Sequence, residues 1–378
     1  MLEDQEEFPK TDIIQGGRPI RVALDATLAG TQNTGDSAYW RGLIYGLGLI
    51  ETDYEFLLFT NGRMNLPSDL PENMLEIPLP KGGSRWYNLF RLPAAARRAG
   101  ADLLHTQYNL SPFSRVPSVT TIHDVSFYVG PEWFRWQDRF LLRTLMPSTV
   151  RRAEAILTVS ETSREEIEEF IPEALGKTYV TPNALDPNFD PADPEEARSR
   201  LKELYGISGP FALTLGSIWP RKNIQLAVDA AKMAQMPLVV TGRHEAGELE
   251  AEGILQTGYV PQEHVPLLYA AAKMLLIPSF HEGFGIPLLE SWASGTPVIC
   301  SSGGALPEVA GDAALVLESW EPADWAEAIR ELGSNSGKVS ELRERGRGRL
   351  NQFSWRTTAE ATVQVYEDVV WSRSPQNC

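Results

Sequence analysis

Residues 278–290 read PSFHEGFGIPLLE and directly follow the apolar run MLLI at 274–277. An apolar run bounded by turn residues predicts a buried strand. Pro287 suits the first turn of a helix and Gly295 suits its end, so a helix is predicted between them. The two glycines of this stretch therefore lie on a turn from strand to helix. Backbone N–H groups and the positive helix end can hold an anion such as phosphate at such a turn.

Two carboxylates flank that turn, because Glu282 precedes the glycines and Glu290 lies one turn into the predicted helix. A carboxylate beside bound phosphate is unfavourable unless another group donates hydrogen bonds to it, and sugar hydroxyls are suitable donors. Phosphate together with hydroxyls predicts a nucleotide sugar as the ligand. A carboxylate pair for general acid–base work is the alternative. Glu290 alone also fits a first-turn glutamate favoured by the helix dipole.

The composition bounds the class of protein. A chain of 378 residues, 43% hydrophobic and 22% charged, is typical of a soluble globular protein with two domains or one large one. The formal net charge of −16 argues against nucleic acid as a partner. Cys300 and Cys378 are the only cysteines, too few for a disulfide framework or a zinc cluster. Without a membrane-length apolar run or a secretory signal, the predicted location is cytoplasmic.

Strand-like apolar runs alternate with helix-length segments along the chain. This pattern is typical of parallel sheets covered on both faces, so we predict an α/β fold of two doubly wound domains facing across a cleft. The proline-rich segment 181–195 is predicted to link them. We expect a disordered acidic tail at 1–17, a first domain at 18–188 and a second at 189–354. The predicted strands are 20–24, 56–59, 102–106, 119–123, 155–159, 179–181, 211–215, 238–241, 274–277, 298–300 and 314–317.

A second motif, GSIWPRKN at 216–223, follows one of these strands. Arg221 and Lys222 stand where the helix 224–234 is predicted to begin, and two cations there oppose the helix dipole. A bound diphosphate removes that conflict, and a solvated basic turn is the alternative. No Asp-x-Asp follows a strand to hold Mg²⁺, so these cations are predicted to replace a metal, and no cofactor is expected. The glycine fingerprints of NAD-binding and P-loop proteins are also missing.

Three weaker signals follow other strands or precede helices. His123 ends the β-branched run 119–123 at a strand end, where parallel-sheet domains bind ligands, and a structural histidine is the equal alternative. Gly35 lies in an Asn-Thr-Gly-Asp-Ser loop that can approach a ligand closely. Tyr259 and Val260 offer an edge for a nucleotide base, with an ordinary turn as the alternative.

The charge is unevenly distributed along the chain. Residues 84–152 contain ten arginines and four acidic residues, a balance of +6, with aromatic residues between them. One interpretation is a pair of amphipathic helices with arginine rims. The other is a surface for an anionic or lipid-linked acceptor, with peripheral contact to the inner membrane face.

Taken together, these residues resemble the retaining glycosyltransferases of family 4, which have the GT-B fold of two Rossmann-like domains. The resemblance covers residues 18–371, and the run HDVSF at 123–127 is similar to mannosyltransferase-type members of polysaccharide biosynthesis. The motifs that carry it are Ile122-His123-Asp124, Thr158-Val159-Ser160, Pro182-Asn183, Pro220-Arg221-Lys222-Asn223, Gly258-Tyr259-Val260, the Glu282 and Glu290 pair, Gly295-Thr296-Pro297-Val298 and Gly304-Ala305-Leu306-Pro307-Glu308-Val309.

Carried over position by position, the resemblance implies a reaction centre. Arg221 and Lys222 bind the donor diphosphate and stabilise the leaving group. Glu282 contacts donor-sugar hydroxyls near the anomeric carbon, and His123 reaches the sugar from the first domain. The final helix, 355–371, crosses back to pack on the first domain.

The resemblance also implies a set of donor-binding residues. Backbone groups of the Gly283-Phe284-Gly285 turn hold phosphate and sugar, and Glu290 binds the ribose hydroxyls. The rest of the donor-binding set is Gly35, Ser217, Arg221, Lys222, Tyr259 and Val260. Many relatives carry an arginine where this chain has Ser217, which leaves the two cations as the main diphosphate clamp. The loop 33–37 also departs from the commoner glycine-rich pattern.

The sequence therefore predicts a metal-independent, retaining glycosyltransferase that uses a nucleoside-diphosphate sugar and a glycan or lipid-linked acceptor. The resemblance favours GDP-mannose as the donor. No strong nucleophile is evident, so catalysis is predicted to rest on charge stabilisation and positioning. A sugar-nucleotide epimerase, a phosphorylase and a non-enzymatic relative that binds nucleotide sugar are the competing hypotheses.

Overall fold

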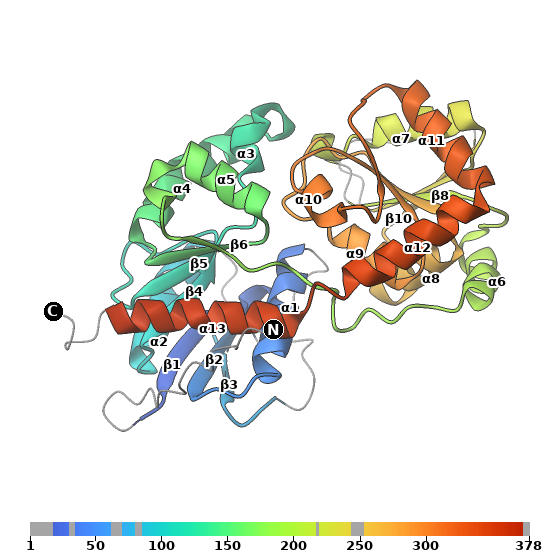
Figure 1. Cartoon of the computed structure of the whole chain (residues 1–378). Coiled ribbons are helices and arrows are strands. Elements are labelled where there is room, and N and C mark those ends of the chain that lie inside the picture. The colour runs from blue at the N-terminus through green and yellow to red at the C-terminus, as the bar shows by residue number, and fades with distance from the viewer. Residues whose placement is uncertain are drawn as a thin grey trace, which may run out of the picture.

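The computed structural model describes residues 18–29, 35–61, 70–79, 85–216, 219–242 and 253–372. The predicted tail at 1–17 and Ser217 lie outside the described residues. Two parallel sheets form two domains that lie side by side (Figure 1). The predicted α/β architecture of two doubly wound domains is confirmed.

The first sheet has seven parallel strands in the order β3-β2-β1-β4-β5-β6-β7. Its order reverses beside β1, the arrangement that places ligands at the carboxyl ends of the central strands. The strands are β1 (Ile20–Asp25), β2 (Tyr54–Thr60), β3 (Met74–Pro78), β4 (Leu103–Gln107), β5 (Ser118–Thr121), β6 (Ala155–Thr158) and β7 (Thr178–Val180).

The second sheet has six parallel strands in the order β10-β9-β8-β11-β12-β13. The reversal here lies between β8 and β11, the strands that precede the two phosphate-type motifs of the sequence. The strands are β8 (Ala212–Leu215), β9 (Leu238–Thr241), β10 (Ile254–Gly258), β11 (Met274–Ile277), β12 (Val298–Ser301) and β13 (Leu315–Leu317).

Helices cover both faces of each sheet, as continuous apolar strands require. In the second domain α8, α9 and α10 pack on one face of the sheet, and α7 and α11 pack on the other. The helices are α1 (Gly35–Gly48), α2 (Arg85–Arg98), α3 (Ser126–Val129), α4 (Trp136–Arg152), α5 (Glu161–Phe170), α6 (Pro194–Tyr205), α7 (Ile224–Ala234), α8 (Val265–Ala271), α9 (Ile286–Ala293), α10 (Leu306–Ala310), α11 (Pro322–Ser334), α12 (Ser336–Leu350) and α13 (Trp355–Ser372).

Two strands, β3 and β10, are missing from the predicted set. Both lie at the edge of a sheet, and each has several partly or fully exposed residues. An edge strand pairs on one side only and does not require a continuous apolar run, and neither β3 nor β10 has one.

The last helix, α13, returns from the second domain and lies across the first (Figure 1). Its first residue, Trp355, packs against α1 where two glycines make room. A Cβ atom at Gly42 would lie 2.0 Å from the indole of Trp355, and one at Gly46 would lie 2.1 Å from its carbonyl oxygen. Trp355 Nε1 also donates to Leu185 O at 2.7 Å, which ties α13 to the segment between the domains.

Candidate functional site

A hydrogen-bonded cluster lies at the carboxyl ends of β8 and β11. The Glu282 carboxylate accepts from Lys222 Nζ at 2.5 Å and from Arg221 Nη1 at 3.2 Å. Ser279 Oγ donates to the same carboxylate at 2.6 Å. The Glu282 side chain is 8% exposed, against 24% for Arg221 and 16% for Lys222. The sequence predicts sugar hydroxyls as the ligand of Glu282 and a diphosphate as the ligand of Arg221 and Lys222. In the structure the three side chains contact one another.

The charges of this cluster shift the pKa of each member. Burial raises the pKa of Glu282, but the charges of Lys222 and Arg221 outweigh burial and bring it to about 2. Burial lowers the pKa of Lys222, and the attraction of Glu282 offsets this only in part. Burial also opposes the charged form of Arg221, but Glu282 and Asp124 raise its pKa. Arg221 and Lys222 therefore share the negative charge of Glu282, and Asp124 is a second anion near Arg221.

The backbone explains how the two cations reach Glu282. Pro220–Lys222 form a 3₁₀ turn, and Asn223 then adopts a left-handed conformation with φ of 47° before α7 begins. Asparagine tolerates this conformation better than most residues. Phe280 N donates to Arg221 O at 2.7 Å, so the turn after β8 is bonded to the loop after β11. The cations therefore lie within the turn that precedes α7, and their side chains bond to the neighbouring loop.

His123 occupies the carboxyl end of the first sheet, just beyond β5. The amide of Gln107, the last residue of β4, donates to His123 Nε2, and Asp36 Oδ1 lies 4.0 Å from the same nitrogen. The ring of Tyr39 meets the imidazole edge-on at 4.8 Å between centroids. Burial lowers the pKa of His123 despite the nearby charges of Asp36 and Asp124. The histidine is therefore neutral at pH 7 and can exchange hydrogen bonds with a hydroxyl.

The two strand ends meet at the boundary between the domains. A Cβ atom at Gly283 would lie 2.9 Å from His123 O and 2.9 Å from Asp124 Cβ, so only glycine allows this approach. Burial raises the pKa of Asp124, but the charges of Arg221 and His281 outweigh it and lower the pKa. The loop that carries Glu282 is therefore in direct contact with the segment that carries His123 and Asp124.

Glu290 lies in α9, next to Tyr269 of α8. The Tyr269 hydroxyl donates to Glu290 Oε2 at 2.6 Å. Burial raises the pKa of Glu290 to about 7, with a further contribution from Asp186 and against the hydrogen bond from Tyr269. Asp186 is paired with Arg41 of α1 at 2.7 Å. The hydrogen-bond partner of Glu290 is thus a side chain of the neighbouring helix, and Glu290 itself lies beyond the first turn of α9.

The structure also places the remaining predicted donor-binding residues. Gly35 is exposed at the first position of α1, with no heavy atom within 4 Å of where its Cβ would be. Tyr259 is exposed after β10, whereas Val260 is buried in the core of the second domain. Phe284 is buried in that core, and Gly285 has φ of 102° at the start of α9. Their roles toward a donor remain predictions.

Several residues of the site were not among the predicted ones. Gln107 and Asp36 contact or approach His123, Ser279 binds Glu282, and Tyr269 binds Glu290. Gln107 ends β4, so the rule that selected His123 could have found it. Tyr269 lies inside a helix, and no local sequence signal marks it.

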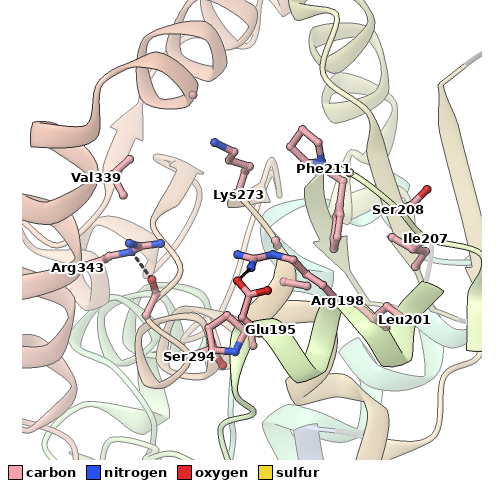
Figure 2. A pocket seen from close by; sticks show the side chains of 18 of the residues that line it. Glu195, Arg198, Leu201, Ile207, Ser208, Phe211, Lys273, Ser294, Val339 and Arg343 are labelled. Carbon is pink, nitrogen blue, oxygen red and sulfur yellow. Dashed lines mark hydrogen bonds and ion pairs between the residues drawn. The ribbon is translucent and has the colours of Figure 1, made fainter. Parts of the chain in front are cut away.

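The larger of the two hollows described below lies away from the Lys222, Arg221 and Glu282 cluster. The hollow beside Lys222 and Glu282 has a volume of about 10 Å³. Another hollow, of about 1140 Å³, lies where Phe211 and Lys273 precede β8 and β11 (Figure 2). It contains Arg343, whose Nε donates to Gly295 O at 2.7 Å. This hollow is at the amino ends of the strands, opposite the end where such sheets bind ligands.

Two further features concern membranes and metals. Within the described residues, every helix is too short or too polar to cross a membrane. The same part of the chain contains no group of three or more His, Cys, Asp or Glu side chains placed to hold a metal ion.

A site at the facing carboxyl ends of two Rossmann-like sheets defines the GT-B class of proteins. Two family models match the chain, Glycosyltransferase Family 4 over residues 47–189 and Glycosyl transferases group 1 over residues 200–349. The chain belongs to glycosyltransferase family 4, and it is a glycosyltransferase of the GT-B fold. Membership of this glycosyltransferase family implies a nucleotide-sugar donor and a glycan acceptor.

Curated relatives include mannosyltransferases. The chain is 34% identical over 269 residues to the O-antigen chain mannosyltransferase B of Escherichia coli, covering 66% of this chain and 70% of the relative. It is 26% identical over 288 residues to the serotype-specific mannosyltransferase WbdA of Escherichia coli, covering 69% of this chain and 35% of WbdA. The chain thus spans about a third of the length of WbdA.

Among solved structures, sucrose-phosphate synthase of Thermosynechococcus elongatus superimposes with a TM-score of 0.71. The two proteins are 23% identical, and the match covers 93% of this chain and 100% of the other. At this identity the likeness shows the GT-B fold alone.

Proposed function

We propose that the chain transfers a mannosyl group from a nucleoside-diphosphate mannose, with GDP as the nucleotide, to a hydroxyl of a glycan or lipid-linked acceptor. The carrying observation is the cluster of Lys222, Arg221 and Glu282 at the carboxyl ends of β8 and β11, facing His123 of the first domain. The mannosyltransferase named among the relatives, at 34% identity, supports the choice of sugar.

In this proposal the two cations stabilise the departing diphosphate. Arg221 offers a planar fork of donors and Lys222 a compact charge, and both lie in a partly buried site where a charge interaction is stronger than in water. They supply positive charge where negative charge develops, as a metal ion does elsewhere. We therefore propose that the reaction needs no metal.

Glu282 orients the donor sugar in the same proposal. Its pKa of about 2 keeps the carboxylate ionised at neutral pH, so it accepts hydrogen bonds from sugar hydroxyls. The neutral imidazole of His123 approaches the sugar from the other domain. Neither residue forms a covalent bond to the sugar. The acceptor hydroxyl attacks the anomeric carbon on the face that the diphosphate leaves, and its proton passes to the departing phosphate oxygen as the bond between that oxygen and the anomeric carbon breaks. The anomeric configuration is therefore retained.

We propose that Glu290 recognises the ribose of the nucleotide. The Tyr269 hydroxyl occupies one oxygen of the Glu290 carboxylate, Oε2. The other oxygen is then the acceptor for a ribose hydroxyl. Since burial brings the pKa of Glu290 to about 7, the carboxylate that accepts this bond is fully formed only above neutral pH.

We also propose that the protein is cytoplasmic and that α4 makes peripheral contact with the inner face of the membrane. Trp136 and Phe140, one turn apart on this helix, are 68% and 67% exposed, and Arg143 lies on the next turn. Exposed aromatic residues beside arginines suit an anionic lipid surface. The aromatic residues of the segment 84–152 do not all belong to this surface. Trp133 stacks on Phe280 of the second domain, with 6.0 Å between the ring centroids.

A transfer assay tests the proposal. The purified chain is incubated with GDP-mannose and methyl α-mannoside, with and without EDTA, and the products are analysed by mass spectrometry and NMR. The proposal expects a dimannoside with an α linkage and an equal rate in EDTA. Altered sugar nucleotide without acceptor would indicate an epimerase, and dependence on free phosphate a phosphorylase. Nucleotide binding without turnover on any glycan acceptor would indicate a non-enzymatic relative.

A further inference from the structure

The amino end of α5, in the first domain, is bonded to a carboxylate of the second domain. Glu161 N donates to Glu308 Oε1 at 2.8 Å, and Thr162 N donates to Glu308 Oε2 at 2.9 Å. The Thr162 hydroxyl adds a third bond to Oε2 at 2.8 Å. The first N–H groups of a helix have no partner within the helix. Here Glu308, 146 residues beyond Thr162, supplies one.

The N-cap residue of the same helix bonds to the loop that carries Glu282. Ser160 Oγ accepts from Ser163 N at 3.0 Å, the usual capping bond, and donates to Gly283 O at 2.8 Å. Ser163 Oγ donates to the same carbonyl at 3.2 Å. Both serines are buried, so these bonds are shielded from water. The carbonyl that follows Glu282 is thus held by the first domain.

Glu308 and Glu282 belong to one connected unit of the second domain. Ala305 N, at the start of α10, donates to Glu282 O at 2.8 Å. A Cβ atom at Gly304 would lie 2.4 Å from that same oxygen, which shows how closely the two segments approach. Within α10, Glu308 O accepts from Arg349 Nη2 at 2.7 Å. A movement of Glu308 relative to α5 therefore moves Glu282 relative to the first domain.

We propose that Glu308 and Ser160 are positioning residues for the transfer reaction. By capping α5 across the domain boundary, they set the place of Glu282 against His123. A carboxylate at the positive end of a helix and charge-assisted hydrogen bonds both favour this contact. The proposal assigns a role to the Thr-Val-Ser motif at 158–160 and to the glutamate of the Gly-Ala-Leu-Pro-Glu-Val motif at 304–309.

Loss of the contact made by Glu308 should affect nucleotide affinity and kcat differently. The nucleotide is held mainly by the second domain, which Glu308→Ala leaves intact. Transfer also needs the first domain at the correct distance, and a misplacement of about 1 Å can cost about 100-fold in rate. We therefore expect Glu308→Ala to lower kcat by about 10- to 100-fold with the affinity for nucleotide within about twofold of wild type.

The test combines kinetics with amide hydrogen exchange. In Glu308→Ala the amides of Glu161 and Thr162 should exchange faster, because they lose their acceptor. Glu308→Gln, which retains one acceptor oxygen, should recover part of the lost kcat. Glu327→Ala, an exposed glutamate on α11 of the same domain, is the matched control and should behave as wild type.

A second pair of variants separates positioning from general damage. Thr162→Val removes one bond to Glu308 and keeps the fold of α5, so it should lower kcat less than Glu308→Ala. Its effect should largely vanish in the Glu308→Ala background, because the shared contact is already lost. Additive effects in the double variant, unchanged kcat in folded Glu308→Ala, or an equal loss of nucleotide affinity and kcat would each overturn the proposal.

The inference rests on the proposed transfer reaction for its kinetic arm only. If wild-type protein shows no transfer, the proposed function fails, and the exchange of the Glu161 and Thr162 amides still tests the cap. If wild type transfers sugar and Glu308→Ala shows neither faster exchange nor lower kcat, the proposed function stands and this inference fails.

Discussion

Lys222 Nζ and the Glu282 carboxylate lie 2.5 Å apart, although the two residues follow different strands and are 60 positions apart in the chain. Their contact joins the two phosphate-type motifs into one charged cluster. The carboxylate fixes the position of the lysine charge before any reaction, which is how an active site avoids the cost of reorganising its dipoles. The pair therefore links recognition of the sugar to stabilisation of the leaving diphosphate.

Lys222→Ala should lower kcat by about 100- to 1000-fold, the usual loss when one stabilising donor is removed. Arg221 still neutralises Glu282 at 3.2 Å, so the fold should be retained. Steady-state kinetics and circular dichroism measure the two effects. Lys232→Ala, an exposed lysine in the last turn of α7, is the matched control. Wild-type kcat in folded Lys222→Ala would remove the lysine from the reaction centre.

The pKa of Glu290, about 7, predicts a pH dependence of donor binding. An ionised carboxylate accepts the ribose hydroxyl bond, so donor affinity should rise as the pH increases through 7 and level off above it. In Glu290→Gln this dependence should disappear, because the amide does not titrate. The dissociation constant of the nucleotide between pH 5.5 and 8.5 is the measurement. The same slope in both proteins would mean that another group is responsible.

His281 and Glu166 predict a pH-dependent contact between the domains. They are 2.9 Å apart, and although burial opposes it, Glu166 and Asp124 raise the pKa of His281 above its ordinary value of 6.5, with Arg221 acting the other way. A raised histidine pKa gives stability that is complete below pH 6.5 and is lost as the pH rises through the folded-state pKa.

The difference in melting temperature between wild type and Glu166→Gln isolates this contribution from other titrating groups. It should be largest near pH 6 and should shrink as the pH approaches 8.5. Glu165→Gln, the exposed neighbour on α5, should differ little from wild type at any pH. A difference that is constant with pH would contradict a titrating His281.

Gly46→Ala should destabilise the protein by about 1–3 kcal/mol, the range for a side chain forced into a packed site. The new methyl group would lie 2.1 Å from Trp355 O, so α13 must move off α1. Urea unfolding measures the loss. Gly348→Ala on α12, where nothing lies within 4 Å, should instead be neutral or stabilising. Equal stabilities of the two variants would contradict the close packing of α13.

Trp136→Ser combined with Phe140→Ser should weaken binding to vesicles that contain phosphatidylglycerol by about tenfold or more, since two exposed aromatic side chains are lost. Vesicle co-sedimentation at low salt is the measurement. Leu204→Ser, an exposed apolar residue on α6 of the second domain, should have no effect. If wild type itself does not bind these vesicles, α4 is no membrane surface.

The sequence predicts the parts of the site that follow a local rule. His123 lies at the end of an apolar run, and Arg221 and Glu282 lie in the turns that follow two others. Parallel sheets gather such positions at one edge. The same reasoning misses β3 and β10, because edge strands are only partly apolar. It also predicts a loop at 33–37, whereas Asp36 lies in α1 near His123.

Contacts between distant segments have no local signal. Glu308 looks like an ordinary first-turn glutamate in the sequence, and its bonds to Glu161 and Thr162 exist only because the domains meet there. The same holds for Tyr269, whose hydroxyl reaches Glu290 from a neighbouring helix. Such partners depend on the fold as a whole. The motifs that contain Glu308 and Glu290 can be recognised in the sequence, but the residues that they contact can be identified only in the structure.

The most direct test of a nucleotide-sugar site is the melting temperature of wild type and Lys222→Ala with GDP, UDP, ADP and dTDP. A ligand at 100 times its dissociation constant stabilises by about 2.7 kcal/mol, which shifts the melting point measurably. The account predicts a shift with GDP in wild type that is much smaller in Lys222→Ala. No shift with any nucleotide in folded wild type, or an equal shift in both proteins, would contradict it.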